Sequence, residues 1–447
     1  MSGVAAAQRL LAVVDKRDPH QPEFRQAVKE VVESLIPVFD VHPEYADVME
    51  RLIEPERAIQ FRVAWLDDKG KIQVNRGFRV QYNQAIGPYK GGLRFHPSVN
   101  MSIIKFLGFE QIFKNSLTTL PMGGAKGGSD FDARGKSDAE IMRFCQSFMT
   151  ELARHIGANI DVPAGDIGVG GKEIGYMFGQ YKRLTKNFEG VLTGKGQTWG
   201  GSLIRPEATG YGLTYFVQEM LKTKNTTLAG KTVCVSGFGN VCWGTCLKSV
   251  ELGAKVVTIS GPDGYIYDPA GMNAEKINYL LELRATNNDV VAPYAQRFPG
   301  SQFHAGKKPW EVKCDVAMTC ATQNELNGDD ARQLVANGCM CVGEGSNMGC
   351  TPEAIEVLQH AGLLFSPGKA SNAGGVAVSG LEMSQNSMRL RWTTEEVDQH
   401  LQRIMRDIHE QCLAACRRFN KGQDYLFGAN AAGFLKVCQA MMEQGCV

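Results

Sequence analysis

The sequence predicts an α/β fold: an N-terminal domain with a mixed sheet, a Rossmann-type doubly wound domain after it, and a helical C-terminal tail. Three observations lead to this prediction. The chain has 447 residues, a length typical of two or three domains. Its first half mixes strand-like runs with helical periodicity, whereas strands and helices alternate regularly from Lys231. From Glu395 the apolar spacing is helical again.

The N-terminal half begins with helical periodicity, from Glu23 to Phe39. Three strand-like runs follow, at Ala58–Trp65, Ile72–Asn75 and Phe78–Tyr82. The turn Asp67–Gly70 between the first two runs predicts a hairpin.

Two helices and three glycine-rich loops complete this half. The helices are predicted over about Ser98–Leu117 and over Asp138–Ile156, with Ser137 as the N-cap of the second. The loops cover residues 87–92, 123–128 and 163–171. Such glycine clusters are typical of tight turns and of backbone that approaches a ligand closely.

The second half predicts a βαβ unit followed by further strands. Thr232–Ser236 is a predicted strand, Asn240–Leu252 a helix and Ala254–Ser260 the second strand. Three short apolar strands come after them: Asp315–Cys320, Met340–Gly343 and Leu363–Ser366. The tail is predicted to hold two helices, with Asn430 as the N-cap of the last: Glu395–Arg418 and Ala431–Gln444.

Composition excludes several classes of protein. A formal net charge of +1 gives no reason to expect a nucleic-acid or membrane partner. No apolar run approaches the roughly 20 residues of a spanning helix, and Met1–Asp18 lacks the pattern of a secretory signal. The 13 cysteines show no framework spacing, which favours free thiols in the cytoplasm over disulfides or a metal site.

A glycine fingerprint predicts dinucleotide binding. Gly237–Cys242 has the form G-x-G-x-x-C, follows a predicted strand and opens a predicted helix. Its first glycine permits a tight turn and its second lets the backbone approach a pyrophosphate at the helix N-terminus. The alternative is a plain turn that needs glycine.

The segment after the second strand leans toward NAD over NADP. Asp263 can accept hydrogen bonds from an adenine ribose, and no arginine stands beside it to bind a 2′-phosphate. Asp263 lies three residues past the strand, however, so it can equally serve only to build the Pro262–Gly264 turn.

Lysines held between glycines predict a site for an anionic substrate. Lys90 and Lys126 both lie in glycine-rich segments, and Lys114 stands three residues after Gln111 on one helix face. A desolvated lysine near other cations has a lowered pKa and can act as a base. We expect Lys90 and Lys114 to lower the pKa of Lys126 in this way. A lysine taken alone is more often a solvated surface charge.

Seven segments, spread over essentially the whole chain, resemble the small, hexameric glutamate dehydrogenases of the Glu/Leu/Phe/Val dehydrogenase superfamily. Two of them are GPYKGGLRFHPSV at Gly87–Val99 and LPMGGAKGGSDFD at Leu120–Asp132. The others are Lys105–Gln111, Asp161–Gly170, Gly200–Gly212, Cys320–Leu326 and Asn372–Glu382.

The resemblance implies reversible NAD(P)-dependent deamination of L-glutamate to 2-oxoglutarate and ammonium by a cytoplasmic homohexamer. Lys126 matches the catalytic lysine and Asp166 the aspartate that relays a proton to the amino nitrogen. Lys90 and Ser379 match groups that hold the side-chain carboxylate. The remaining substrate residues implied are Gln111, Lys114, Gly165, Thr193, Arg205 and Asn372. The cofactor residues implied are Thr209, Gly237, Phe238, Gly239, Asn240, Val241, Ser260, Asp263, Ala321, Thr322 and Asn347.

The family fold implies a substrate-binding and oligomerisation domain over residues 1–200, to which residues 425–447 return, and an NAD(P)-binding domain over 201–424. One segment departs from the family pattern: Gly349 and Cys350 replace a proline and a threonine, which we expect to loosen a loop over the cofactor. Many NADP-using members have S-D-S where this chain has Gly261–Asp263.

Three alternatives remain. A dehydrogenase for an apolar amino acid would leave Lys90 with nothing to pair with in a buried site. A pyridoxal-phosphate enzyme would use Lys126 as a Schiff base. A ligand sensor on the same fold would not need Lys126 and Asp166 together.

Overall fold

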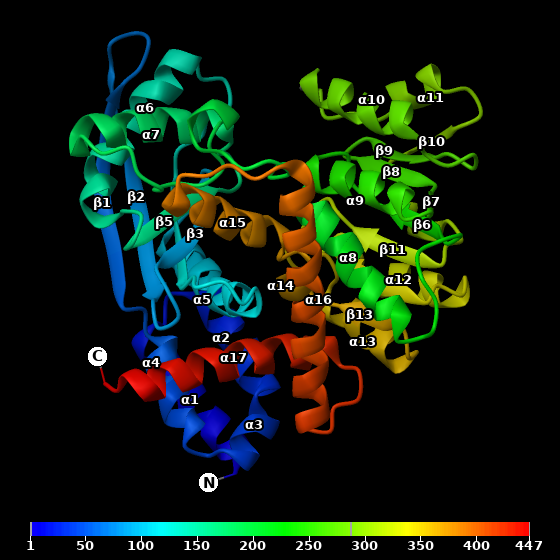
Figure 1. Ribbon diagram of the computed structural model, residues 1–447, viewed down its shortest axis with the longest axis horizontal. Coiled ribbons are helices and arrows are strands. Elements are labelled where there is room, and N and C mark those ends of the chain that lie inside the picture. Colours follow the sequence, from blue (N-terminus) through cyan, green and yellow to red (C-terminus); the bar gives the residue numbers. More distant parts are fainter. Residues whose placement is uncertain (1, 287, 447) are drawn as a thin grey trace. The chain divides into compact units, whose positions relative to one another are not determined.

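The computed structural model describes residues 2–286 and 288–446, so the outermost positions of the predicted ranges 1–200 and 425–447 lie outside it (Figure 1). The chain forms two compact units. Unit 1 comprises the described residues up to Leu203, residues 377–397 and those from Asn430 onward; unit 2 comprises residues 204–376 and 398–429. None of the described helices is long and apolar enough to cross a membrane.

A five-stranded mixed sheet organises unit 1. Its strands lie in the order β1-β2-β4-β3-β5. The β1/β2 and β2/β4 pairs are antiparallel, whereas β3 is parallel to both β4 and β5. The strands are β1 (Arg57–Leu66), β2 (Ile72–Asn83), β3 (Tyr89–Phe95), β4 (Gly124–Ser129) and β5 (Asp161–Gly165). The predicted mixed sheet and hairpin are therefore confirmed.

Strand β2 joins two of the predicted strand-like runs into one strand. Gly77 lies between them, and a side chain there would come within 2.2 Å of the Phe61 ring on β1. The glycine thus admits an aromatic side chain without interrupting the strand pairing.

Eight helices of unit 1 that matter for the site are α1 (Gly3–Arg17), α2 (Pro22–Ser34), α3 (Ile36–Val41), α4 (Tyr45–Ile53), α5 (Met101–Leu117), α6 (Asp138–Leu152), α7 (Gly171–Thr185) and α15 (Gly374–Met388), which begins in unit 2. Ser137 caps α6 as predicted, in a capping box with Glu140. Helix α5 begins at Met101, capped by Asn100, because the Asn100 side chain accepts from the Ile103 N–H.

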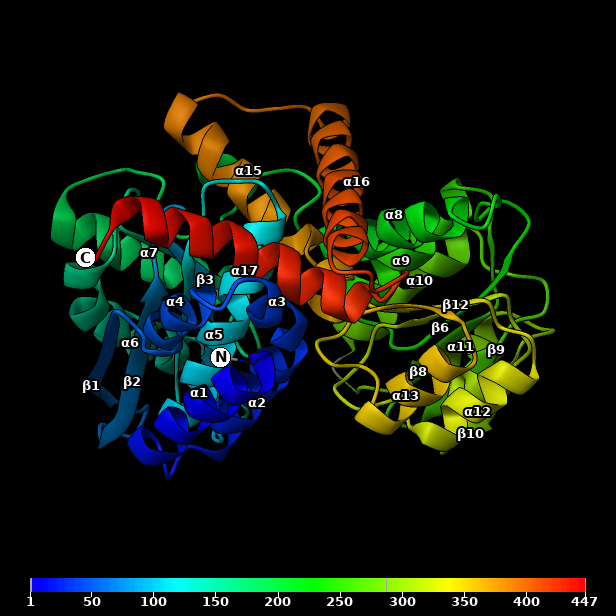
Figure 2. The same ribbon diagram turned by 90° about the horizontal axis from the view of Figure 1, so that it is seen from below.

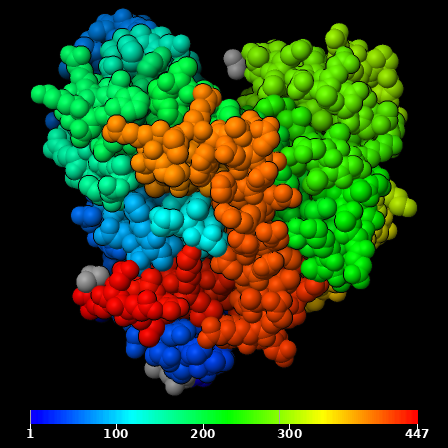
Figure 3. Space-filling model, viewed as in Figure 1, coloured from blue at the N-terminus to red at the C-terminus, as the bar shows by residue number. Residues whose placement is uncertain are grey.

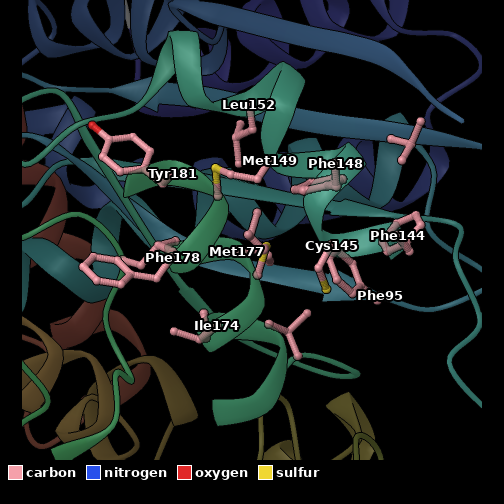
Figure 4. Packing of buried hydrophobic residues seen from close by; sticks show 14 of the residues in the cluster. Phe95, Phe144, Cys145, Phe148, Met149, Leu152, Ile174, Met177, Phe178 and Tyr181 are labelled. Atoms are coloured by element: carbon pink, nitrogen blue, oxygen red, sulfur yellow. The ribbon is translucent and has the colours of Figure 1, made fainter. Parts of the chain in front are cut away.

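An aromatic core lies between the sheet and helices α6 and α7. Leu93 and Phe95 of β3 pack there against Phe144 and Phe148 of α6, all of them buried. Figure 4 shows these helices contributing further core side chains, among them Met149 and Met177. Because side chains alternate along a strand, the opposite face of β3 carries Lys90, Gly92 and Arg94.

Unit 2 is the predicted doubly wound domain. Its five strands are all parallel, in the order β13-β12-β11-β6-β7. They are β6 (Thr232–Val235), β7 (Lys255–Val256), β11 (Val316–Thr319), β12 (Cys341–Glu344) and β13 (Leu364–Ser366). Helices that follow or flank them are α8 (Ala208–Lys222), α9 (Asn240–Glu251), α12 (Gly328–Ala336) and α13 (Pro352–His360).

The predicted strand Ala254–Ser260 is divided between two sheets. Its first part is β7 of the parallel sheet, and its second part is β8 (Thr258–Gly261) of a separate antiparallel sheet. That sheet also holds β9 (Gly264–Tyr267) and β10 (Gln302–Ala305), in the order β10-β9-β8.

The C-terminal helices are α16 (Thr394–Arg418) and α17 (Tyr425–Gln444). The prediction that Asn430 is an N-cap is wrong, since α17 begins five residues earlier, after Asp424 accepts from the N–H groups of Leu426 and Phe427. The Asn430 side chain instead donates to the Ser34 hydroxyl at 2.9 Å. Figures 2 and 3 show α17 lying against the N-terminal helices, where Phe434 packs edge-on against Phe39 and Tyr45.

Candidate active site

The side chains of Lys126 and Asp166 contact each other beside Gly92 of β3. Lys126 lies on β4 and Asp166 directly follows β5, so both flank the central strand of the parallel part of the sheet. The Lys126 Nζ donates to Asp166 Oδ1 at 2.6 Å. A side chain at Gly92 would lie 3.2 Å from that Nζ and 2.9 Å from the Asp166 Cβ. The absence of a side chain at Gly92 therefore leaves the space that the pair occupies.

Arg94 is a second cation on Asp166. Its Nε donates to Asp166 Oδ2 at 2.7 Å, so each carboxylate oxygen has its own positively charged donor. Arg94 and Lys90 lie on the same face of β3, on either side of Gly92.

Burial and these neighbouring charges shift both members of the pair. Burial lowers the pKa of Lys126; Asp166 opposes this, and the positive charges of Arg94 and Arg79 add to it. Burial works against the ionised form of Asp166, but Lys126 and Arg94 outweigh it and hold its pKa below the usual range. Arg94 and Arg79 are therefore two cations that lower the Lys126 pKa, and the same effect of Lys90 and Lys114 stays a prediction.

Lys90 is fully buried, and its ammonium contacts the loop that carries Thr193. Its Nζ donates to the Val162 carbonyl at 3.0 Å and to the Thr193 hydroxyl at 2.7 Å. Both of these acceptors are uncharged oxygen atoms.

Helix α5 carries Gln111 and Lys114 and is tied to the strands by Asn115. The Asn115 amide donates to the carbonyls of Lys90 and Gly123, at 2.9 and 2.6 Å, and its oxygen accepts from Gln111 at 2.7 Å. Asn115 thus fixes α5 to the segments before Lys126 and around Lys90.

Helix α15 carries the buried Ser379 and holds the loop that follows Thr193. One turn beyond Ser379, the fully buried Glu382 accepts from the N–H groups of Gly194 and Lys195 at 3.0 and 3.3 Å. It also pairs with the Lys195 ammonium at 2.9 Å. In unit 1 the structure therefore brings Lys126, Gly165 and Asp166 together, and joins Lys90 to Thr193.

The dinucleotide fingerprint of unit 2 has the geometry that a pyrophosphate needs. Gly237 has a φ of +80°, and a side chain there would lie 2.7 Å from the Cys320 carbonyl. Gly239, the N-cap of α9, has open space where a side chain would stand, and within the described chain no side chain caps this helix. The first N–H groups of α9, from Asn240 and Val241 onward, have no partner within the helix. These residues fit a dinucleotide cofactor.

Ser260 and Asp263 both bind backbone in this structure. The Gly237 N–H donates to the Ser260 hydroxyl at 2.8 Å, which ties β8 to the fingerprint. The Asp263 carboxylate accepts from the N–H groups of Val291 and Ala292 at 2.9 to 3.0 Å. Of the two sequence interpretations of Asp263, these contacts favour the structural one.

A second group of predicted residues gathers in unit 2 around Asn372. Its amide donates to Asn347 at 2.8 Å, while its own carbonyl oxygen is buried and has no partner among the described residues. A side chain at Gly375 would meet Thr209 at 2.5 Å and Arg205 at 3.6 Å. The remaining predicted cofactor residues, Phe238, Ala321 and Thr322, lie on the loops that follow β6 and β11.

The loop with the unusual Gly349 and Cys350 is held on both sides, in contrast to the looseness expected from the sequence. The N–H groups of Asn324 and Leu326 donate to the carbonyls of Met348 and Gly349, at 2.8 and 3.0 Å. The Cys350 N–H donates to Glu344 at 2.8 Å. A side chain at Gly349 would lie 2.1 Å from the Thr319 hydroxyl, so glycine fits this loop to its neighbour.

Comparison with known proteins places these features in a family. Residues 200–445 match the Glutamate/Leucine/Phenylalanine/Valine dehydrogenase model, and residues 55–183 match the Glu/Leu/Phe/Val dehydrogenase dimerisation domain. The chain is 62% identical over 442 residues to the NAD-specific glutamate dehydrogenase of Bacteroides fragilis, covering 98% of this chain and 99% of that protein. It is 60% identical over 443 residues to the NADP-specific glutamate dehydrogenase of Giardia intestinalis, covering 98% and 99%.

Among solved structures, the crystal structure of Plasmodium falciparum glutamate dehydrogenase is similar with a TM-score of 0.98 and 53% identity. The match covers 100% of this chain and 96% of that one. The two sequence relatives thus differ in the cofactor that their names give, and the solved structure shares its fold with all of this chain.

Proposed function

We propose that this chain, which belongs to the Glu/Leu/Phe/Val dehydrogenase family, catalyses the reversible NAD(P)-dependent oxidative deamination of L-glutamate to 2-oxoglutarate and ammonium. The observation that carries the proposal is the contact of the buried Lys126 with Asp166, beside the strand that carries the fully buried Lys90. A base with a lowered pKa and a separate buried cation suit a substrate with one reacting end and one charged end.

Substrate binding uses both carboxylates of glutamate. Lys90, with Thr193 and Ser379, binds the side-chain carboxylate. Lys114 and Gln111 bind the α-carboxylate, the Gly165 backbone lies at the amino end, and Arg205 and Asn372 complete the substrate set. An apolar substrate would bring no carboxylate to the fully buried Lys90 ammonium, so this cation favours a substrate with a charged side chain.

Lys126 and Asp166 carry the proton transfers. A dinucleotide held by the fingerprint residues Gly237 and Gly239 would supply the acceptor for the hydride that leaves the substrate Cα. Neutral Lys126 then takes a proton from a water molecule, and the oxygen of this water attacks the imine carbon of 2-iminoglutarate. Protonated Lys126 stabilises the charge that develops on this oxygen, and Asp166 relays a proton to the departing ammonia.

Unit 2 binds the cofactor through the fingerprint glycines and the N-terminus of α9, with Thr209, Phe238, Asn240, Val241, Ser260, Asp263, Ala321, Thr322 and Asn347 as the further contacts. The cofactor is NAD or NADP, because relatives of both kinds are similar to this chain. The local residues lean toward NAD.

We propose residues 1–200 with 425–447 as the substrate and oligomerisation domain and 201–424 as the NAD(P)-binding domain, although residues 377–397 of the latter range belong to unit 1. The assembly is a homohexamer in the cytoplasm. The thirteen free cysteines support a reducing compartment. The dimerisation-domain match and exposed apolar side chains on the β1/β2 hairpin support self-association.

Initial rates with 2-oxoglutarate and ammonium, measured with NADH and with NADPH, test the activity and the cofactor preference. A preference for NADPH of about tenfold, or about 1.4 kcal/mol, would overturn the lean toward NAD. Lys126→Ala should lose most of kcat while NADH fluorescence titration shows unchanged cofactor binding. Lys69→Ala, at an exposed hairpin lysine, is the matched control. Near-normal turnover of the Lys126 variant would remove this residue from its role.

A further inference from the structure

We infer that Arg94 is a positioning residue of this site: it orients the Asp166 carboxylate toward Lys126 and supplies the positive charge that keeps this carboxylate ionised. The inference rests on the proposed function, in which Lys126 and Asp166 handle protons. It adds a residue that touches neither substrate nor cofactor in the mechanism above.

The Asp166 carboxylate is held by a donor at each of its oxygens. Asp166 directly follows β5, where a free carboxylate would be able to rotate about its side-chain bonds. Arg94 Nε donates to one oxygen of the Asp166 carboxylate at 2.7 Å, and Lys126 Nζ donates to the other at 2.6 Å. These two hydrogen bonds fix the plane of the carboxylate. Side-chain exposure is 17% for Arg94 and 15% for Asp166, so the contact is shielded from most of the solvent. Charge-assisted hydrogen bonds of this length are among the strong ones.

Strand β3 fixes the position of Arg94. Lys90, Gly92 and Arg94 follow one another on one face of the strand, and Gly92 leaves the space for the Lys126–Asp166 contact. Arg94 pairs in register with Gly128 on β4 and follows Leu93, which pairs with Gly165 on β5. The guanidinium is therefore carried by the same rigid sheet as the two groups that it serves.

Several elements of unit 1 contribute charged groups around Lys126. Arg79 comes from β2 and is itself paired with Asp161 of β5, while β3 contributes Lys90 and Arg94. Helix α5 packs Gly108 against the Lys126 backbone and carries Lys105, Glu110 and Lys114, of which Lys105 pairs with Asp18. Arg94 differs from all of these because it binds the carboxylate that is the direct partner of Lys126.

Removing the Arg94 charge should raise the pKa of Lys126 for two reasons. The repulsion that lowers the Lys126 pKa is lost, and Asp166, no longer shared, attracts the Lys126 proton more strongly. Both effects raise the pKa of Lys126. Since deamination needs neutral Lys126, the acidic limb of its pH profile should move to higher pH.

The experiment compares wild type, Arg94→Met, Arg94→Lys and Arg9→Met. Arg9 pairs with Asp47 at 2.7 Å elsewhere in unit 1 and is the matched control. We expect the acidic limb of kcat/KM for glutamate to move up by at least half a pH unit in Arg94→Met. The limb should lie near its wild-type position in Arg94→Lys and Arg9→Met. In a separate rescue test, millimolar guanidinium should restore activity to Arg94→Ala more than to Lys126→Ala.

A uniform loss of rate in Arg94→Met with an unmoved limb would assign Arg94 a structural role only and overturn the inference. If turnover is too low for a profile, the pH dependence of Lys126 acetylation, followed by mass spectrometry of the folded variant, gives the same comparison. An unmoved acetylation midpoint likewise overturns it. Wild-type protein that does not oxidise glutamate would contradict the proposed function instead, so the two failures are distinguishable.

Discussion

At the scale of single residues, three cations of the site differ in the groups that they contact. Lys90 donates to the Val162 carbonyl and the Thr193 hydroxyl, Lys126 contacts a carboxylate, and Arg94 contacts the same carboxylate from the other side. The shared carboxylate of Asp166 supports proton chemistry at Lys126, and the proposed function gives Lys90 the side-chain carboxylate of the substrate.

Replacing Lys90 by methionine should change which substrate the enzyme prefers. Methionine fills a similar volume but offers no charge to a side-chain carboxylate. We expect kcat/KM for glutamate to fall by about two to three orders of magnitude, or about 3 to 4 kcal/mol. Activity with norleucine, which has no such carboxylate, should change much less. The measurement is the ratio of the two kcat/KM values.

Lys69→Met is the control for the Lys90 variant, since Lys69 is an exposed hairpin residue. A ratio that stays at the wild-type value in Lys90→Met would contradict the assignment of Lys90 to the side-chain carboxylate.

Candidate residues of the site could be proposed from the sequence, but the contacts between them could not. Lys126 stood out as a lysine between glycines, whereas the family resemblance supplied Asp166. Arg94 was missed although it lies in the same segment as Lys90, and strand alternation from Lys90 could have placed it on the same face. Its partner Asp166 directly follows another strand and lies 72 residues away in the sequence. The hydrogen bonds of Asn115 and Glu382 were hidden for the same reason.

At the scale of helices and strands, periodicity located the elements better than it located their ends. Helix α17 begins at Tyr425 because Asp424 caps it, whereas the sequence offered Asn430 as an equally suitable N-cap. The strand after α9 was predicted as one element, yet the chain changes sheets between Val256 and Thr258. Apolar runs do not reveal such a change, because both sheets bury these residues.

The helices at the end of unit 2 contain a histidine that should make stability depend on pH. His409 of α16 is buried, hydrogen-bonds the Tyr425 hydroxyl at 2.9 Å and packs edge-on against Phe216 of α8. Burial lowers its pKa to about 4. Between this value and the ordinary 6.5, the unfolded chain binds a proton that the folded chain does not, so stability falls as pH drops through this window.

We expect His409→Gln to remove most of this dependence. At pH 5 the wild-type penalty relative to pH 7 is about 2 kcal/mol, and glutamine cannot take up the proton. Urea unfolding followed by circular dichroism at both pH values measures the difference. His20→Gln, at an exposed position, should lose as much stability between pH 7 and pH 5 as the wild type does. An equal loss in His409→Gln would show that His409 is not the responsible group.

At the scale of the whole molecule, both units are discontinuous in sequence. Unit 1 takes in residues 377–397 and the C-terminal segment, which packs Phe434 onto the N-terminal helices. No local pattern predicts such a return, because it depends on contacts between the two ends of the chain. The resemblance to a known family was the only sequence-based source for it.

The last prediction concerns assembly. Four apolar side chains lie exposed on one face of the β1/β2 hairpin, as the cross-strand pairs Ala64–Val74 and Leu66–Ile72. Leu66, Ile72 and Val74 are 47%, 66% and 63% exposed, although the pairing residues on the opposite face include the buried Val63 and Trp65. Exposed apolar patches of this kind mark interfaces, and the hairpin lies within the dimerisation-domain match.

We expect light scattering after gel filtration to give wild-type protein a mass of about six 48.9 kDa chains. Ile72→Glu combined with Val74→Lys should yield smaller species with the circular-dichroism spectrum retained, because charges replace the apolar contact. Leu281→Lys, at an exposed leucine of unit 2, should remain hexameric. A hexamer that survives the double substitution would exclude the hairpin from the interface, and a monomeric wild type would contradict the hexamer itself.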